Sequence, residues 1–211
     1  MWRNNLIMDT RRKTFKISMV LLILVVTSCA GLTRSEQAAT RTWLLHPGGQ
    51  GASAAASAPV TGISITVTAI PGLDNDRILT LSGEGELNHI SGARWADNVP
   101  ELVTSLVART LQQTAYFDVD SSRSDSAPKD CGLQLLIQEF YVIIGSAGHT
   151  SAVRLAMTGT YRCRTGKYQA INLNASIPVQ DPRMGDVVAA FQHGMDDMLA
   201  QLLDILKSAQ Q

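Results

Sequence analysis

Apolar and polar residues alternate over residues 63–69, and residues 77–82 and 86–90 look like two further strands. A period of two predicts strands that each bury one face. A Pro-Gly pair at 71–72 interrupts the pattern after the first strand. The glycines at 83–85 predict a turn between the other two strands, because glycine adopts positive φ without a steric penalty.

The spacing of apolar residues becomes helical after residue 98. Apolar side chains then recur every three or four positions, which predicts an amphipathic helix packed on the sheet. Asn98 is suited to cap the first turn, with Glu101 as its capping-box partner. The predicted apolar stripe comprises Val99, Leu102, Val103, Leu106, Val107 and Leu111.

A longer amphipathic helix is predicted near the end of the chain. Asp181 and Pro182 are typical of a helix start. Methionines in its apolar stripe are expected to belong to the core rather than to a binding surface. The stripe comprises Val187, Val188, Phe191, Met195, Met198, Leu199, Leu202, Ile205 and Leu206.

Residues 131–144 and 150–163 form two strand-like runs joined by a loop with two glycines, which predicts a hairpin centred on Ala147. The register that follows gathers apolar residues on one side of the pair, and matching faces of this kind set register. The expected pairs are Leu133–Tyr161, Leu135–Gly159, Ile137–Met157 and Tyr141–Val153 on the apolar side, with Gln134–Thr160 and Gln138–Ala156 on the other.

The same register places Cys131 opposite Cys163. Directly opposed residues of an antiparallel pair have Cα atoms about 4.5–5.5 Å apart, which suits a disulfide. We therefore predict a bridge between them in an oxidising compartment, with two buried thiols as the alternative.

A third run, residues 171–177, alternates in the same way after a predicted three-residue loop at 165–167. Gly166 at the centre of this loop suits the left-handed conformation that such loops need. The order strands, helix, strands, helix indicates an α+β fold. We expect a largely antiparallel mixed sheet with two amphipathic helices packed on one face.

The first 28 residues have the order of a secretory signal: a basic lead, an apolar run at 17–26, then small polar residues. A transmembrane anchor is the less favoured alternative, because a membrane-spanning helix needs roughly 20 apolar residues. Residues 26–29, Val-Thr-Ser-Cys, resemble the lipobox of bacterial lipoproteins. This resemblance implies cleavage before Cys29 and its acylation, and Ala30 after it implies the outer membrane. A true start at Met8 would leave this unchanged.

The chain is expected to consist of a signal peptide at 1–28, a lipidated flexible tether at 29–40 and a periplasmic domain at 41–211. Residues 42–45 predict a short strand, and the Gly, Ala and Ser-rich residues 46–59 predict a flexible loop rather than a phosphate-binding one. Without the signal, 13 basic and 17 acidic residues remain. Binding to nucleic acid is therefore not expected.

Motifs for catalysis are not found in the sequence. It has no Walker motif and no Gly-x-Ser-x-Gly elbow. Its four histidines, at 46, 89, 149 and 193, lack metal-binding spacing. Neither Cys131 nor Cys163 has the surroundings of a nucleophile. We expect no enzyme activity, no metal and no cofactor.

Several segments together resemble the ABC-type transport auxiliary lipoproteins, the PqiC-like group of membrane-integrity transporter subunits. They are the lipobox, the strand at 42–45, residues 65–79, the Arg-Trp-Ala-Asp run at 94–97 that is expected to open a helix, and the long final helix. The family usually has Leu-Asp-Arg after a proline and a bulky residue; here Pro71, Leu73 and Asp74 are compressed, Asn75 replaces the arginine, and Arg77 follows.

The resemblance implies a non-catalytic part of an envelope lipid-transport system. It would act with an inner-membrane ABC transporter and an MCE-type lipid-shuttling protein. Regulation of a cell-wall or envelope assembly enzyme and carriage of lipid between sheet and helices are the alternatives. An exposed edge strand would also allow a homo-oligomer.

The candidate partner-binding residues lie in the loop after residue 70 and at the start of the predicted helix. For the tryptophan among them, the competing interpretation is that it packs the helix onto the sheet. The set is Leu73, Asp74, Arg77, Arg94 and Trp95.

Overall fold

The computed structural model describes residues 39–48, 61–114, 116–119, 130–145, 150–181 and 183–210. The chain divides into two units, residues 1–39 and 40–211, and every described helix and strand belongs to the second. The expected signal peptide, Cys29 and most of the expected loop at 46–59 lie outside the described residues. No helix within the described residues is long and apolar enough to cross a membrane.

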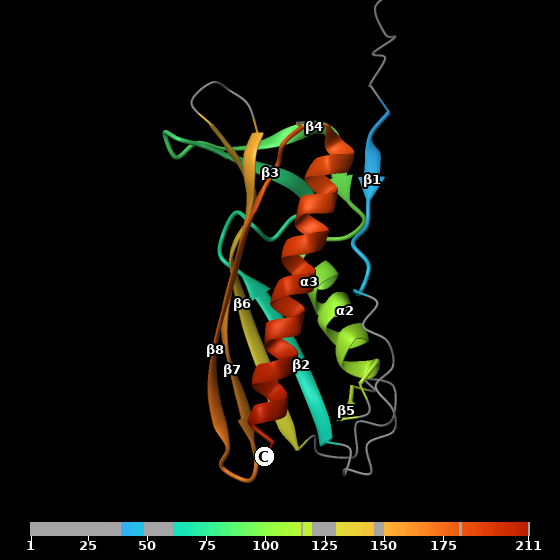
Figure 1. The fold of residues 1–211 in the computed structure, drawn as a ribbon, viewed down its shortest axis with the longest axis vertical. Helices are drawn as coiled ribbons and strands as arrows, with labels where there is room; N and C mark the ends of the chain where they lie inside the picture. The colour runs from blue at the N-terminus through green and yellow to red at the C-terminus, as the bar shows by residue number, and fades with distance from the viewer. Residues whose placement is uncertain are drawn as a thin grey trace, which may run out of the picture. The chain divides into compact units, whose positions relative to one another are not determined.

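Within the described residues, eight strands form one mixed sheet (Figure 1). The pairs β3–β4, β6–β7 and β7–β8 are antiparallel, whereas β1–β4, β2–β5, β2–β6 and β3–β6 are parallel. The short β5 was not predicted. The strands are β1 Arg41–Trp43, β2 Thr61–Ala69, β3 Arg77–Ser82, β4 Leu87–Trp95, β5 Phe117–Asp118, β6 Cys131–Ile144, β7 Thr150–Cys163 and β8 Tyr168–Pro178.

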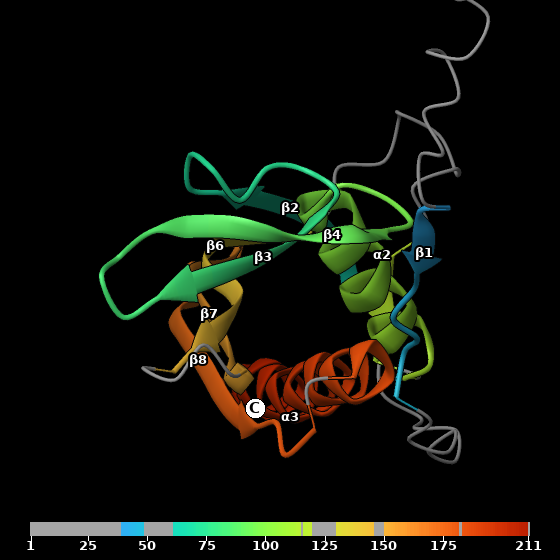
Figure 2. The ribbon, with the colours of Figure 1, turned by 90° about the horizontal axis from the view of Figure 1, so that it is seen from above.

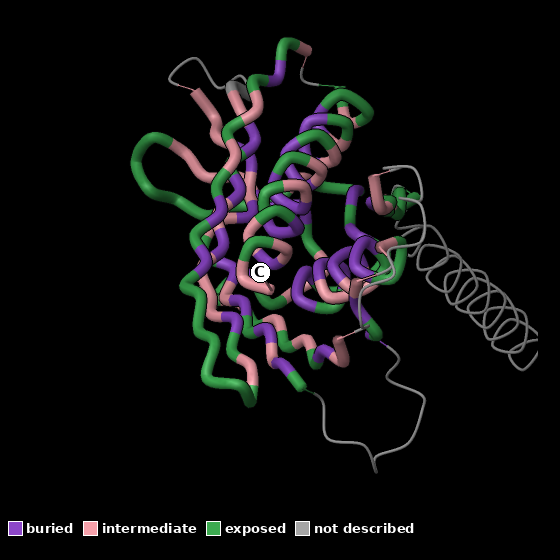
Figure 3. Tube along the Cα trace, turned by 60° about the horizontal axis from the view of Figure 1, so that its bottom comes forward, coloured by how far each residue is buried: buried purple, intermediate pink, exposed green. Residues whose placement is uncertain are grey.

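Two helices pack against the sheet, which confirms the α+β class. α2, Val99–Gln112, packs on β2, and α3, Met184–Ser208, packs on β7 and β8 (Figure 2). Buried positions form one stripe along each helix and alternate with accessible ones along the strands (Figure 3). The predicted stripe of α2 is buried throughout. Met195 and Met198 of α3 are at most 1% exposed, so they belong to the core as predicted.

The strands β2 and β3 lie end to end along one edge of β6. β2 pairs with residues 131–137 of β6, and β3 pairs with residues 141–144. A β-bulge at Gln138 separates the two stretches. Buried residues of β6 are odd-numbered before the bulge and even-numbered after it. The bulge therefore keeps apolar residues of both halves on the core side.

The predicted register of the β6–β7 hairpin is correct from Cys131 to Ile137 and wrong by one residue from Glu139 to Ile143. A second irregularity restores it at Ile144, which pairs with Thr150. Tyr141 pairs with Arg154 rather than Val153, and Glu139 rather than Gln138 pairs with Ala156. The cause is the extra residue at Gln138, which shifts Glu139 to Ile143 by one. Phe140 and Val142 are consequently the buried residues, and Tyr141 is not.

α2 begins where the apolar spacing predicted, at Val99 after the N-cap residue Asn98, but the residues before it and the capping contact differ from expectation. Arg94 and Trp95 end β4 instead of opening the helix, because a bulge containing Gly92 at φ 71° lets the strand continue. Asn98 is the N-cap residue, but its side chain makes no capping hydrogen bond. The backbone N–H of Val99 donates instead to the carbonyl oxygen of Asn75, at 3.0 Å.

Two further boundaries are shifted. α3 begins at Met184, since Arg183 is its N-cap and Asp181 belongs to the preceding turn, where its Oδ1 accepts the Arg183 N–H at 3.1 Å. The β7–β8 turn lies one residue earlier than expected, because the Cys163 N–H donates to the carbonyl oxygen of Lys167 at 2.9 Å. Gly166 has the expected positive φ, 87°.

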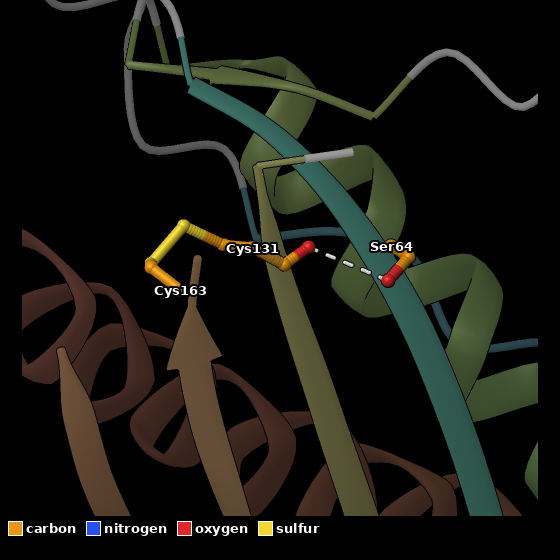
Figure 4. The surroundings of a disulfide bond; sticks show 3 residues. All are labelled: Ser64, Cys131 and Cys163. Atoms are coloured by element: carbon orange, nitrogen blue, oxygen red, sulfur yellow. Dashed lines mark hydrogen bonds between the residues drawn. A yellow bond between two sulfur atoms is a disulfide. The ribbon is translucent and has the colours of Figure 1, made fainter. Parts of the chain in front are cut away.

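Cys131 and Cys163 form a disulfide between the start of β6 and the end of β7 (Figure 4). Their Cα atoms are 4.0 Å apart. The Ser64 hydroxyl of β2 donates to the carbonyl oxygen of Cys131 at 3.4 Å, so three strands meet at this point. A bridge across 32 residues stabilises the protein mainly by restricting the unfolded chain.

Replacement of both cysteines, as Cys131→Ser with Cys163→Ser, is expected to lower the free energy of unfolding by about 2–4 kcal/mol. The fold should persist, because the β6–β7 pairing continues along both strands. Far-ultraviolet circular dichroism and urea unfolding of the variant measure both effects. Loss of all structure would contradict this view of the bridge as an accessory.

Gly194 marks a close approach between α3 and the sheet. A Cβ atom there would lie 2.6 Å from Cδ1 of Leu155 and 3.3 Å from Cγ1 of Ile177. Leu155 is itself 1% exposed and has little room to move. The missing side chain therefore lets the helix pack closely on β7 and β8.

We expect Gly194→Ala to lower the free energy of unfolding by about 1–3 kcal/mol, because overpacking exceeds the gain in helix propensity. Gly185→Ala in the same helix is the matched control, since a Cβ there meets nothing within 4 Å. The control should leave stability unchanged or raise it by up to about 1 kcal/mol. Equal urea midpoints for the two variants would refute the close approach.

Candidate partner-binding site

The connection between β2 and β3, residues 70–76, is a tightly hydrogen-bonded turn. The side-chain amide nitrogen of Asn75 donates to the carbonyl oxygen of Gly72 at 2.8 Å. Its Oδ1 accepts the backbone N–H of Arg77, also at 2.8 Å. Gly72 has φ 93°, a conformation that favours glycine. The Asn75 side chain therefore closes this turn.

The turn is joined to the end of β4 and the start of α2. The backbone N–H of Trp95 donates to the carbonyl oxygen of Asp76 at 2.7 Å. The Arg94 guanidinium and the Asp76 carboxylate form an ion pair at 3.6 Å. These contacts and the Val99–Asn75 hydrogen bond bring the turn and the end of β4 to one corner of the domain. All five predicted residues therefore lie at this corner.

Two of the five predicted residues are buried there. Leu73 is 2% exposed and Trp95 is 1% exposed. The Trp95 ring meets Phe140 and Phe191 edge to face, with centroids 5.8 and 5.0 Å apart. These rings come from β4, β6 and α3, so the indole joins three elements. The indole N–H of Trp95, unlike its backbone N–H, finds no acceptor among the described residues.

The remaining predicted residues, Asp74, Arg77 and Arg94, lie accessible beside Asp76 and His89, which were not predicted. We call these five residues the rim. Arg77 lies with Nη1 3.3 Å from Nδ1 of His89. The side chains of Arg94 and Asp76 are 55% and 40% exposed. Sequence reasoning missed Asp76, although it precedes Arg77 in the same turn, and it missed His89, whose position depends on the β3–β4 pairing. The rim presents both signs of charge on a rigid base.

The first segment of the domain also reaches this corner. Trp43 of β1 is the register partner of Trp95. Farther along, the Gln192 side chain accepts the His46 N–H at 2.9 Å and donates to the His46 carbonyl oxygen at 2.7 Å. A Cβ at Gly48 would lie 2.8 Å from Asp196 Oδ1. Residues 41–48, which we call the strap, are thus held between β4 and α3.

A second polar group lies on β6 and β7. The Arg154 guanidinium pairs with Glu139 at 3.2 Å, and Tyr141 is the register partner of Arg154. Burial raises the pKa of Tyr141, and Glu139 raises it further, while Arg154 lowers it. This phenol therefore stays protonated at neutral pH. In the part of the chain that the structure describes, no group of three or more His, Cys, Asp or Glu side chains is arranged to hold a metal ion.

Residues 43–203 match the family described as the ABC-type transport auxiliary lipoprotein component. This match covers well over half of the sequence, and the chain belongs to that family. Membership identifies it as an auxiliary component of ABC-type transport, which implies association with transporter components and a place in the cell envelope.

Solved structures show the same fold. The crystal structure of protein XCC0632 from Xanthomonas campestris matches with a TM-score of 0.62 and 16% identity, over 82% of this chain and 95% of that one. A second crystal structure, of an uncharacterized protein, matches with a TM-score of 0.59 and 11% identity, over 78% and 96%. No curated protein matches the sequence.

The two neighbours Arg94 and Trp95 are expected to respond differently to truncation. Trp95→Ala should lower the free energy of unfolding by about 3–5 kcal/mol, because it removes the centre of the aromatic cluster. Arg94→Ala should change it by less than about 1 kcal/mol, because the ion pair is exposed to solvent. Chemical unfolding of both proteins tests this. A stable Trp95→Ala protein would show that the indole is not a structural element.

Proposed function

We propose that this chain is a non-catalytic docking component of an envelope lipid-transport system. An acylated Cys29 anchors it in the outer membrane, and residues 41–211 face the periplasm. There it works with an MCE-type protein and an inner-membrane ABC transporter. Family membership over residues 43–203 carries the proposal, and the lipobox-like residues 26–29 support the anchor.

The rim is the surface that we propose for the partner. Asp74, Arg77 and Arg94 are exposed there, whereas Leu73 and Trp95 support them from within the core. Complementary charges at an interface steer association and select the partner. The hydrogen-bonded turn holds these charges in place before binding, which reduces the entropy lost in the complex.

Cross-linking of the full-length protein in intact cells tests the function. Mass spectrometry of the adducts should identify an MCE-type or ABC transporter component, and the mature N-terminal peptide should carry an acylated Cys29. Capture of a cell-wall synthase alone would replace transport with the regulatory alternative. Phospholipid recovered with the purified protein, without any protein partner, would favour a carrier. An unmodified Cys29 would remove the anchor.

Charge reversal tests the rim separately. Asp74→Arg combined with Arg77→Glu should reduce the cross-link by about tenfold, because like charges would then face each other across the interface. Asp197→Arg combined with Arg109→Glu is the matched control, since it reverses one exposed acid and one exposed base on the helices. Equal yields from the two double variants would place the contact elsewhere.

A further inference from the structure

The turn between β7 and β8 carries an unusual group of side chains. We define the tip as residues 162–168, whose sequence is Arg-Cys-Arg-Thr-Gly-Lys-Tyr. It contains three cations and no acidic residue. Tyr168 is 57% exposed, and the Arg162 guanidinium lies 5.7 Å from the centre of its ring. The tip lies at the opposite end of the long strands from β3 and β4 (Figure 1).

The tip is rigid in spite of its exposure. The Cys131–Cys163 disulfide fixes its base to β6 (Figure 4). The Cys163 N–H donates to the Lys167 carbonyl oxygen and the Arg164 N–H to the Asp130 carbonyl oxygen, both at 2.9 Å. The cationic side chains are therefore presented on a fixed backbone, and binding would lose little backbone entropy.

Several cations elsewhere in the domain already contact a side chain of their own. Arg77, Arg94, Arg154 and Arg183 each contact a polar or acidic side chain. Among the described residues, by contrast, no acidic side chain forms an ion pair with Arg162, Arg164 or Lys167. Three positive charges are thus left for an external partner, although the mature chain is acidic overall.

We infer that the tip is a docking surface for an acidic face of another protein. Arginine and tyrosine are enriched among the residues that dominate protein interfaces, and the tip presents them side by side. Charge-driven binding to a lipid surface uses clusters of about four to eight basic residues, more than the three found here. The inference requires an acidic protein surface and does not require that protein to belong to a transport system.

A photo-reactive residue in the tip provides the test. Benzoylphenylalanine replaces Thr165 in the full-length, membrane-anchored protein, and cells are irradiated. Thr165 is exposed and uncharged, so its replacement leaves all three cations of the tip in place. The cross-linked peptide, identified by mass spectrometry, should be rich in Asp and Glu. Arg164→Glu with Lys167→Glu should lower the yield by about tenfold, and Tyr168→Ala should lower it as well.

Arg41→Glu with Arg109→Glu is the matched control, because it changes net charge equally at exposed cations outside the tip. This control should keep the wild-type yield, and all variants should keep the wild-type unfolding midpoint. A phospholipid adduct, a yield equally sensitive to both reversals, or no adduct would overturn the inference. A cross-link to an acidic face of a cell-wall enzyme would support the tip while refuting the proposed transport partner.

Discussion

The one-residue bulge at Gln138 is the constraint on which the rest of the sheet depends. β6 must pair with β7 along one edge and with two successive strands, β2 and β3, along the other. A regular strand through this point would turn Phe140 away from the helices, because side chains alternate between faces. With the bulge, Phe140 meets Trp95 and Phe191, while the earlier half of the strand holds the disulfide. The bulge thus lets one strand, β6, contribute both to the aromatic cluster beneath the rim and to the disulfide at the base of the tip.

Much of this architecture is predictable from periodicity. The stripe of α2, the β6–β7 register up to Ile137 and the cysteine pairing all follow from matching apolar faces. The predicted register fails at Gln138 and Glu139, two polar residues in succession that indicate a bulge. Tyr141 hides this indication, because its ring can be counted as an apolar residue of the regular alternation. The Asn98 cap fails for another reason. Pro100 at position N2 has no N–H that a cap could accept. The Val99 N–H at N1 donates to the carbonyl oxygen of Asn75, a contact that exists only after tertiary folding.

The candidate site separates in a similar way into what the sequence can and cannot indicate. Its segments were identifiable, but the division into buried Leu73 and Trp95 and exposed Arg77 and Arg94 depends on where β4 ends. β4 reaches Trp95 through an irregular stretch in which Gly92 has a positive φ, and a pattern with a period of two does not reveal such a stretch. Exposure then assigns the roles: apolar side chains maintain the shape of the corner, and charged ones remain available for contact.

The strap gives the domain a defined mechanical connection to whatever precedes Thr40. Tension applied there along β1 acts in shear on its three register pairs with β4 and on the two hydrogen bonds between His46 and Gln192. Bonds loaded in shear share a force, whereas bonds that are peeled break one after another. Because β1 is at the edge of the sheet, its rupture would leave β4, β3 and β6 paired. Separation of the strap would therefore spare these strand pairs but would withdraw Leu45, which is 1% exposed, from the core.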